Sequence, residues 1–347
     1  MQRKKLFLTN CELSRKTRRL LESGLGPSFV IRSTDDVKDS ELEGVEIMML
    51  DTMPPSGRTW IRNEKIGKMP NLKFIQSVRA GVDSIDFEQI PSTVQFSGNV
   101  GAYSEPMAEH TLGMLLYFAK HLGSQNENLK NGIFEPGPSV SLEGKTLGVV
   151  GAGGIGQAVA RLARCFGMKT LGVNTRGKPA PHFDRVVSMK KLDQVLQKSD
   201  IVVLSLQLNV KTFHIINREK LQLMKRDCIL INVARGYVID EEALYYHLLR
   251  NPSFKCALDV WWHYPSDGRK EFSQKYPFFE LPNIIGTPHV SGIVPEGRQI
   301  TVERAAWNVL KFVKRKRGVD GLVDRRDYSG LNKMIDEVAA TGRVGIS

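Results

Sequence analysis

The sequence predicts an α/β fold made of two doubly wound domains. The chain has 347 residues, more than twice the ~150 residues of a typical domain. Short apolar runs alternate with polar helical stretches in two successive series, a pattern typical of parallel strands joined by helices. A glycine-rich turn follows the first apolar run of the second series, and such turns connect strands to helices in open α/β sheets.

The predicted strands fall into two groups along the chain. The first group comprises residues 6–8, 29–31, 45–50, 72–75 and 94–96. The second group comprises residues 146–150, 170–173, 201–204, 229–233, 256–260 and 284–285. Each group can form a sheet of its own, so we expect two α/β units in sequence.

Two helical stretches decide how the chain divides into domains. Residues 105–130 have Pro106 in a first-turn position and apolar residues at helical spacing, which predicts one long amphipathic connecting helix. Residues 295–316 form another helical stretch after the last predicted strand, and we expect it to return to the first domain. The predicted domains are therefore residues 1–103 with 290–347, and residues 104–289.

The composition argues against several classes of protein. Apolar residues make up 41% and charged residues 25% of the chain, which is unlike a disordered chain, a collagen or a coiled coil. No apolar run approaches the ~18 residues of a membrane span, and the four cysteines lie far apart without a CxxC pair. We therefore expect a cytoplasmic protein without a signal peptide, a disulfide framework or membrane contact. The histidines and cysteines show no metal-ligand spacing, so no metal is expected.

The net charge of +12 results from 49 Lys and Arg against 37 Asp and Glu. A basic chain could bind nucleic acid, or an anionic cofactor and substrate. The densest basic run, residues 311–317, lies at the end of a predicted helix, where cations complement the helix dipole. Because no nucleic-acid-binding motif accompanies this run, a nucleic-acid partner is not expected.

The strongest local signal is the sequence GAGGIG at residues 151–156, directly after an apolar run. Gly151 permits a tight turn, Gly153 lets the backbone approach a pyrophosphate, and Gly156 allows close packing of the following helix. The N-terminus of that helix presents free N–H groups to the anion. The pattern predicts a dinucleotide site that includes Gly151, Gly153, Gly154, Ile155 and Gly156.

The end of the next predicted strand indicates which dinucleotide is bound. In NAD sites an acid about 20 residues beyond the glycines holds the ribose 2′-OH. The corresponding residue here is Asn174, followed by Thr175, Arg176 and Lys178. A carboxylate that would repel a 2′-phosphate is missing, and a guanidinium that could bind one is near. We therefore predict NADP(H) in preference to NAD(H), with Asn174, Thr175 and Arg176 in the site; Asn174 could also bond a ribose hydroxyl.

Five further motifs follow one another along the chain. They are AGVDSID at residues 80–86, MAEHTLGMLL at 107–116, INVARG at 231–236, ALDVWW at 257–262 and TPHVSG at 287–292. With the glycine-rich turn, they make residues 72–307 closely resemble the D-isomer-specific 2-hydroxyacid dehydrogenase family. The resemblance implies a Rossmann NAD(P)-binding domain, a flavodoxin-like substrate domain and a homodimer. It also implies hydride transfer between NADP(H) or NAD(H) and a small 2-keto or 2-hydroxy acid such as glyoxylate, hydroxypyruvate or glycerate.

The resemblance also assigns roles to individual residues. Reduction of a 2-keto acid requires a cation for the carboxylate and a proton donor beside the ketone. Arg235 matches the family's substrate-binding arginine, His289 its catalytic histidine, and Asp259 the aspartate that accepts from the nicotinamide carboxamide. The loop that holds the substrate carboxylate corresponds to Arg79, Ala80, Gly81 and Val82. The cofactor site implied by the resemblance also includes Val233, Ala234, Asp259 and His289.

One position departs from the family pattern. Most members carry a glutamate just before the proline that follows the DVF-like strand, where it orients the catalytic histidine, and here that residue is Tyr264. A phenol can hydrogen-bond an imidazole but cannot balance an imidazolium. We therefore expect either a His289 that loses its proton more readily than in relatives with glutamate, or a substitute role for Asp267 or His263.

Two alternative functions are open from the sequence. The DVWW sequence resembles the DVWF of formate dehydrogenases, which are relatives, although Tyr103 stands where those enzymes usually carry a formate-binding asparagine. Corepressors related to the family act as dinucleotide-sensing binding proteins, and the basic segment 311–326 is the feature that favours this alternative.

His110 is expected to be a packing or dimer-interface residue.

Overall fold

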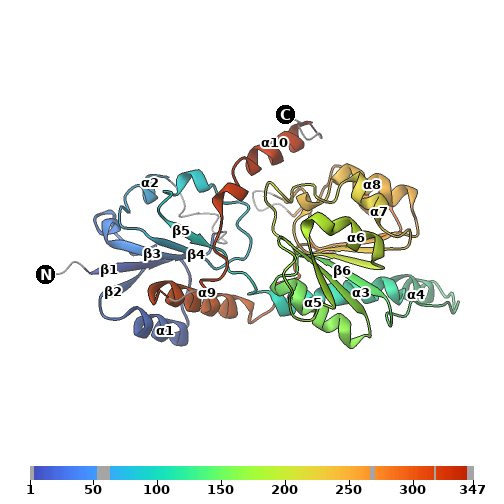
Figure 1. Cartoon of the computed structure of the whole chain (residues 1–347), viewed down its shortest axis with the longest axis horizontal. Coiled ribbons are helices and arrows are strands. Elements are labelled where there is room, and N and C mark those ends of the chain that lie inside the picture. The colour runs from blue at the N-terminus through green and yellow to red at the C-terminus, as the bar shows by residue number, and fades with distance from the viewer. Residues whose placement is uncertain (1–3, 53–62, 266–269, 316–317, 342–347) are drawn as a thin grey trace. The chain divides into compact units, whose positions relative to one another are not determined.

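The structure is a computed structural model that describes residues 4–52, 63–265, 270–315 and 318–341. It contains two parallel sheets flanked by helices (Figure 1), which confirms the predicted α/β class. The chain divides into two compact units, residues 1–103 with 294–347 and residues 104–293. Hydrophobic core clusters lie within each unit.

The first unit contains a five-stranded parallel sheet in the order β2-β1-β3-β4-β5. Its strands are β1 (Lys5–Thr9), β2 (Phe29–Ser33), β3 (Val45–Leu50), β4 (Phe74–Ser77) and β5 (Gln95–Ser97). Its helices are α1 (Arg15–Leu25), α2 (Asn63–Ile66), α9 (Gly297–Val313) and α10 (Leu331–Thr341). The strands coincide with the predicted apolar runs because parallel strands covered on both faces lack a polar face.

Helix α9 comes from the far end of the chain and packs beside α1 against the first sheet (Figure 1). Phe312 stacks on Phe74 of β4 with ring centroids 4.3 Å apart. The buried Asn308 donates from Nδ2 to Gln76 Oε1 at 2.6 Å. The helical stretch predicted near the C-terminus is therefore an integral part of the first unit.

The second unit contains a seven-stranded parallel sheet in the order β12-β11-β10-β9-β6-β7-β8. Its strands are β6 (Thr146–Val150), β7 (Lys169–Asn174), β8 (Arg185–Ser188), β9 (Ile201–Leu204), β10 (Ile229–Asn232), β11 (Lys255–Leu258) and β12 (Ile284–Gly286). Its helices are α3 (Ser104–Ala119), α4 (Leu122–Lys130), α5 (Gly154–Cys165), α6 (Leu192–Lys198), α7 (Arg218–Leu223) and α8 (Glu241–Arg250). Because β7 and β9 flank β6, the strand order reverses beside β6, and ligands of such sheets bind outside the carboxyl ends of the strands at that point.

The prediction of one long helix over residues 105–130 is wrong. Two helices, α3 and α4, occupy this stretch, and His121 between them has a left-handed backbone with φ of 51°. α3 buries several residues in the core, whereas no residue of α4 is buried. Packing therefore fixes the direction of α3 but not that of the stretch beyond it.

Within the described ranges, no helix combines the length and apolar character that a membrane crossing requires.

Candidate active site

The glycine-rich turn between β6 and α5 combines tight packing with one open position. Gly151 has a φ of 110°, and a Cβ there would lie 2.5 Å from the carbonyl oxygen of Ser205, so a side chain would be both strained and crowded. A Cβ on Gly156 would lie 2.2 Å from the carbonyl oxygen of Gly151. A Cβ on Gly153, in contrast, would meet no described atom within 4 Å. The turn therefore leaves space at Gly153.

The N-terminus of α5 is available to an anion. Gly153 is its N-cap residue, and no side chain caps the helix there. The first N–H groups of a helix have no partner within the helix, and an anion placed on them gains hydrogen bonds and a favourable dipole interaction. Ser205, which the sequence did not single out, donates from Oγ to the carbonyl oxygen of Gly151 at 2.9 Å and supports the turn. This cradle, with Gly154 and Ile155 as the first residues of the helix, fits a pyrophosphate.

Asn174, at the end of β7, shapes the following loop with its side chain. Its Oδ1 accepts from the backbone N–H groups of Arg176, Gly177 and Lys178 at 3.2, 2.7 and 3.1 Å. Its Nδ2 donates to the carbonyl oxygen of Lys178 at 2.7 Å. The amide is thus engaged within the loop, whereas the sequence allowed a direct bond to a ribose hydroxyl. Thr175, Arg176 and Lys178 are exposed on this loop.

Arg235 follows β10 and is held by its neighbours. Asn232 donates from Nδ2 to the carbonyl oxygen of Arg235 at 2.8 Å and accepts at Oδ1 from the N–H of Ala234 at 2.9 Å. The Arg235 guanidinium donates from Nη1 to the carbonyl oxygen of Ala234 at 2.7 Å. Val233 and Ala234 are buried and Arg235 is half-buried. The turn therefore places the guanidinium at the carboxyl edge of the second sheet.

Asp259, which follows β11, is fully buried and anchors the turn that carries His289. Its Oδ1 accepts from Thr287 Oγ1 at 2.6 Å and from the N–H of Val290 at 2.8 Å. Its Oδ2 accepts from the N–H of Ser291 at 3.0 Å. The resemblance assigned Asp259 to the nicotinamide carboxamide, and the structure shows it as the anchor of the 287–291 turn.

His289 is exposed on this turn, in a backbone conformation that few side chains adopt. Its φ of 59° is left-handed, which costs a residue with a side chain about 1–2 kcal/mol. Its N–H donates to the carbonyl oxygen of Thr287 at 3.0 Å. Such strain persists only where the surroundings hold it, and the bonds to Asp259 do so here. His289 and Arg235 thus follow strands of the same sheet at the same edge.

Tyr264 contacts His289 through its ring. The two ring centroids are 5.5 Å apart and the planes are tilted by 42°. The phenol oxygen accepts from the backbone N–H of Trp261 at 3.1 Å. The family's glutamate position is therefore filled by an aromatic ring that packs on the imidazole and brings no negative charge.

The structure pairs His263, one of the two alternative partners, with a different residue. His263 Nε2 lies 3.9 Å from Glu241 Oε2 at the start of α8. Burial raises the pKa of the Glu241 carboxyl to about 7, and burial together with the nearby Lys275 charge lowers the pKa of His263. Asp267, the other alternative, lies outside the described residues.

His110 is connected to the His289 turn, whereas the sequence predicted only a packing or dimer-interface role for it. Its Nε2 lies 3.1 Å from Thr287 Oγ1 and 3.8 Å from Asp259 Oδ1. His110 belongs to α3, and Thr287 directly follows β12. The sequence signal for this link is Thr287, the threonine two residues before His289 in the TPH motif.

The predicted substrate loop of the first unit begins at an ion pair. Arg79 donates from Nε and Nη2 to the two carboxylate oxygens of Asp51 at 2.7 and 3.3 Å. Its backbone N–H donates to Ser77 Oγ at 3.0 Å. Ala80 and Gly81 follow as half-buried residues, and Val82 is buried. The Arg79 charge, which could have served as a second cation for substrate, is thus paired with a buried carboxylate.

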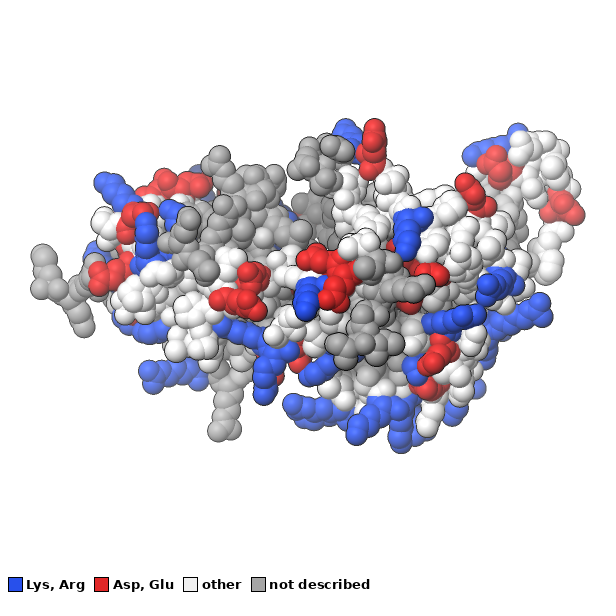
Figure 2. Space-filling view, turned by 90° about the horizontal axis from the view of Figure 1, so that it is seen from above, with Lys and Arg blue, Asp and Glu red and all other residues white. Residues whose placement is uncertain are grey.

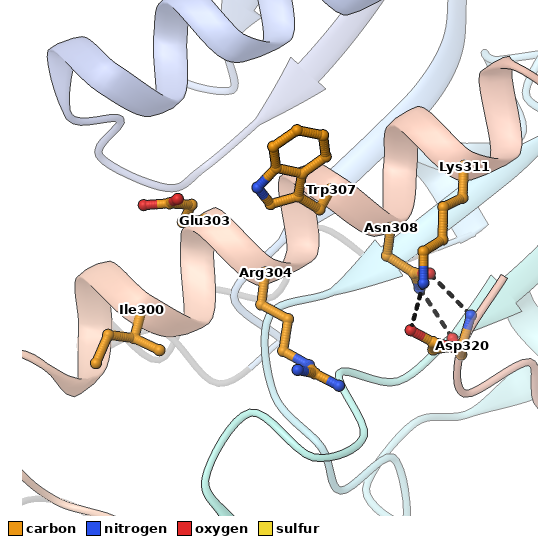
Figure 3. Close-up of a pocket in the computed structure, with 7 residues that line it drawn as sticks. All are labelled: Ile300, Glu303, Arg304, Trp307, Asn308, Lys311 and Asp320. Atoms are coloured by element: carbon orange, nitrogen blue, oxygen red, sulfur yellow. Dashed lines mark hydrogen bonds and ion pairs between the residues drawn. The ribbon is translucent and has the colours of Figure 1, made fainter.

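A pocket of about 560 Å³ lies beside α9 in the first unit (Figure 3). Its lining consists of Ile300, Glu303, Arg304, Trp307, Asn308, Lys311 and Asp320. Lys311 Nζ lies 2.7 Å from Asp320 Oδ2. The Asn308 side chain donates from Nδ2 to the carbonyl oxygen of Asp320 and accepts at Oδ1 from the N–H of Asp320. These polar groups join α9 to its neighbouring segment, and the lining includes none of the predicted site residues.

Charged side chains of both signs share the face drawn in Figure 2. Several described cations are paired, as Lys16 is with Glu303 at 2.8 Å and Arg161 with Glu105 at 2.5 Å. A continuous basic surface is the usual footprint of nucleic-acid binding. On this face Asp and Glu lie among Lys and Arg across the middle, whereas Lys and Arg predominate along the lower edge.

Comparison with known proteins assigns the family. The family model described as D-isomer specific 2-hydroxyacid dehydrogenase, NAD binding domain, matches residues 112–291. The chain is also 33% identical over 277 residues to hydroxypyruvate reductase of Thermotoga maritima, which covers 77% of this chain and 88% of that protein. The chain belongs to the D-isomer-specific 2-hydroxyacid dehydrogenase family. The dehydrogenase is accordingly an oxidoreductase that uses a nicotinamide cofactor and acts on the CH–OH group of 2-hydroxy acids.

Solved structures agree with this assignment. The dehydrogenase is similar to a glyoxylate reductase from Paecilomyes thermophila, with a TM-score of 0.72, 25% identity and coverage of 94% of this chain and 100% of that one. It is also similar to D-lactate dehydrogenase from Aquifex aeolicus complexed with NAD and lactic acid, with a TM-score of 0.65, 27% identity and coverage of 92% and 99%. The likeness extends over both units of the chain.

Proposed function

We propose that this dehydrogenase reduces a small 2-keto acid, glyoxylate or hydroxypyruvate, with NADPH. The observation that carries the proposal is the arrangement in the second unit. The open turn at Gly153, the exposed loop at Arg176, Arg235 and His289 all follow strands at the carboxyl edge of one parallel sheet, where ligands of such sheets bind. Relatives named hydroxypyruvate reductase and glyoxylate reductase support the choice of acid.

The proposed mechanism divides the reaction among few residues. Bound reduced nicotinamide would supply the hydride. Arg235 binds the substrate carboxylate and polarises the neighbouring carbonyl, since a planar guanidinium can reach both oxygens. His289 donates a proton to the carbonyl oxygen as the alcohol forms. The backbone amides of residues 80–82 would also hold the substrate carboxylate, because the N–H of Arg79 already donates to Ser77 Oγ. Asp259 would accept from the carboxamide only through Oδ2, because its Oδ1 already accepts from two donors.

Tyr264 affects the pH at which His289 can donate its proton in this proposal. A carboxylate at position 264 would stabilise protonated His289, whereas the Tyr264 ring, tilted by 42° to the imidazole, carries no negative charge. A glutamate at this position would therefore make His289 hold its proton to higher pH. In Tyr264→Glu, the fall of kcat/KM for keto-acid reduction at rising pH should move to higher pH. An unchanged profile would contradict this role.

The preference for NADPH rests on the loop after β7. Asn174 holds this loop with both ends of its amide, and Thr175, Arg176 and Lys178 project from it into solvent. In the described part of the chain, neither of the two cations forms an ion pair with a carboxylate. Two free cations and a hydroxyl suit a 2′-phosphate.

We also propose that the dehydrogenase is a homodimer assembled through the segment that begins at α4. Large apolar side chains are exposed along this segment: Leu122 is 52%, Leu129 60% and Phe134 84% exposed. Exposed apolar surface of this kind is a feature of interaction sites. Light scattering should give twice the 38.9 kDa of one chain, and Phe134→Glu should shift the protein toward the monomer.

The cysteines favour the cytoplasm as the compartment. Cys11, Cys165, Cys228 and Cys256 are all free thiols. Burial raises the pKa of the Cys11 thiol to about 11 and also raises those of Cys228 and Cys256. Unpaired thiols of this kind are typical of reducing compartments, so we propose a cytoplasmic enzyme.

The test is an absorbance assay at the reduced-nicotinamide band. The purified enzyme is mixed with NADPH or NADH and with glyoxylate, hydroxypyruvate, pyruvate or longer keto acids, while formate with NAD(P)+ runs alongside. We expect rapid oxidation of NADPH by glyoxylate or hydroxypyruvate, and a loss of about tenfold or more in NADPH preference for Arg176→Ala. Turnover of formate alone would replace the proposal with formate oxidation. Tight cofactor binding without turnover on any acid would favour a dinucleotide sensor.

A further inference from the structure

Three side chains form a continuous hydrogen-bonded chain behind His289. His110 Nε2 lies 3.1 Å from Thr287 Oγ1, and Thr287 Oγ1 lies 2.6 Å from Asp259 Oδ1. The Asp259 carboxylate accepts the backbone N–H of Val290 at Oδ1 and that of Ser291 at Oδ2. This series of hydrogen bonds therefore extends from helix α3 to the backbone immediately after His289.

The direction of these bonds follows from the donors available. An ionised carboxylate only accepts, so the single hydroxyl proton of Thr287 is donated to Asp259. Thr287 Oγ1 must then accept from His110, which fixes the His110 tautomer with its proton on Nε2. Each member thus has one defined role, and the loss of any member leaves the next one without its partner.

The turn at His289 needs such support because of its backbone conformation. Its left-handed backbone, with φ of 59°, is unfavourable for a residue with a side chain and must be held by its surroundings. A buried carboxylate that binds two successive turn amides can fix the backbone, but only if its own orientation is fixed.

His110 supplies that orientation from a rigid element. α3 packs on α5 and has seven buried residues. The His110 ring therefore projects from a helix whose position is fixed by packing. The ring itself is only 24% exposed. Trp261 adds a second support, because its indole Nε1 donates to the carbonyl oxygen of Thr287 at 2.9 Å.

We propose that His110 is a positioning residue for the reaction: through Thr287 and Asp259 it fixes the turn that presents the His289 imidazole to the substrate. This inference rests on the proposed role of His289 as proton donor. It gives a function to a histidine that touches neither substrate nor cofactor in the proposed mechanism. The inference concerns the orientation of His289 and does not require His110 to change its protonation state.

The experiment compares His110→Ala, His110→Gln and Thr287→Val in keto-acid reduction. Removal of the link should lower kcat by about 10- to 100-fold, the effect of a small misplacement of a reacting group, with little change in KM. Glutamine can donate from the position of Nε2, so His110→Gln should stay within about threefold of wild type. Thr287→Val removes only the hydroxyl and should reproduce His110→Ala. The solvent deuterium isotope effect on kcat should rise in both defective variants, because proton transfer becomes slower relative to the other steps.

Two further variants distinguish the positioning role of His110 from an effect on stability and from the proposed role of His289. Met114→Ala opens a cavity on the buried side of α3 and should lower Tm while kcat stays within about twofold of wild type, which distinguishes positioning from stability. His289→Gln tests the underlying proposal: full activity in this variant would remove the proton-donor role itself. If His289→Gln is strongly impaired while His110→Ala and Thr287→Val keep wild-type kcat and isotope effect, the positioning role of His110 is overturned and the role of His289 stands.

Discussion

The first strand–helix turns of the two units show how one architecture produces different surfaces. In both units a central parallel strand, β1 or β6, leads into a helix whose N-terminus lies at the carboxyl edge of the sheet. In the first unit Ser14 caps α1 by accepting the N–H of Thr17 at 3.1 Å. In the second unit Gly153 leaves the start of α5 without a side-chain cap. An anion site therefore depends on the residues of the turn and not on the fold alone.

The neighbouring residues extend this difference. Beside the turn of the first unit, Asn10 exchanges two hydrogen bonds with the backbone of Asp51, whose carboxylate holds Arg79. Asn10, Asp51 and Arg79 beside the first turn thus satisfy one another. At the edge of the second unit, Arg176 and His289 are exposed. The start of α1 is therefore closed by its own side chains, whereas the start of α5 is open to a ligand.

The largest expected effect comes from filling the open position at Gly153. Its backbone, with φ of −86° and ψ of −161°, is one that any residue adopts, so Gly153→Val should fold normally. The added side chain would occupy the space proposed for the pyrophosphate, and Kd for NADPH should rise by about 100-fold or more. Fluorescence titration measures Kd and thermal unfolding measures Tm. Gly113→Ala on α3, where a Cβ also meets nothing within 4 Å, is the matched control and should leave Kd unchanged; an unchanged Kd in Gly153→Val would refute the comparison.

A pH series contrasts one carboxylate from each unit. Burial raises the pKa of Glu241 in the second unit to about 7, so its ionisation opposes folding: stability is present at low pH and lost as pH rises from about 4.5 to 7. For Glu46 in the first unit, burial acts to raise the pKa, but hydrogen bonds and charges from Lys73 and Lys5 outweigh burial and lower it. Its contribution is present above the unfolded pKa and lost as pH falls through the folded value.

Substitution should therefore act in opposite directions. At pH 8 Glu241→Gln should be more stable than wild type by about 2 kcal/mol. The shift of the Glu241 pKa from 4.5 to about 7 corresponds to ~3.5 kcal/mol at ~1.4 kcal/mol per pKa unit, and solvent screening reduces it. The gain should vanish near pH 4. Glu46→Gln should be less stable than wild type at pH 8, and its deficit should shrink in acid. Denaturant unfolding at several pH values measures both. Parallel pH dependence of the two variants would show that the carboxylates do not differ as described.

The smallest expected effect concerns the cap of the first unit. Ser14→Ala removes the acceptor for the Thr17 N–H and should cost about 1 kcal/mol of unfolding free energy. Ser14→Asp, which can cap equally well, should retain the stability. Neither variant should alter Kd for NADPH, since this helix start is proposed to bind no ligand. A change in cofactor affinity without a change in stability would reverse the assignment of the two turns.

Most of the fold could be predicted from the sequence because buried parallel strands appear as apolar runs. β8, Arg185–Ser188, was missed because it is a short edge strand with only two apolar residues. The break at His121 was missed because periodicity records apolar spacing, whereas the helix direction there depends on which residues find a core to bury against.

The site was predictable in its residue types and less so in its contacts. The glycine spacing carries its own geometry, so the open position at Gly153 and the crowding at Gly151 and Gly156 follow from the motif. The use of Asn174 to shape a loop and the link from His110 to Thr287 depend on side-chain partners far apart in sequence, 177 positions for the latter pair. No local pattern encodes such pairs, and only the folded chain reveals them.

The most direct test of the account is steady-state reduction of the best keto acid by wild type, His289→Gln and Arg235→Gln, with Kd for NADPH measured in parallel. Loss of the proton donor should lower kcat/KM by about 10²–10⁴-fold, and loss of the guanidinium should raise KM and lower kcat/KM as well. Cofactor affinity should stay within about threefold of wild type in both, because the phosphate cradle is separate from these side chains. Near-wild-type kcat/KM in either variant would contradict the assignment of the reaction to this edge of the second sheet.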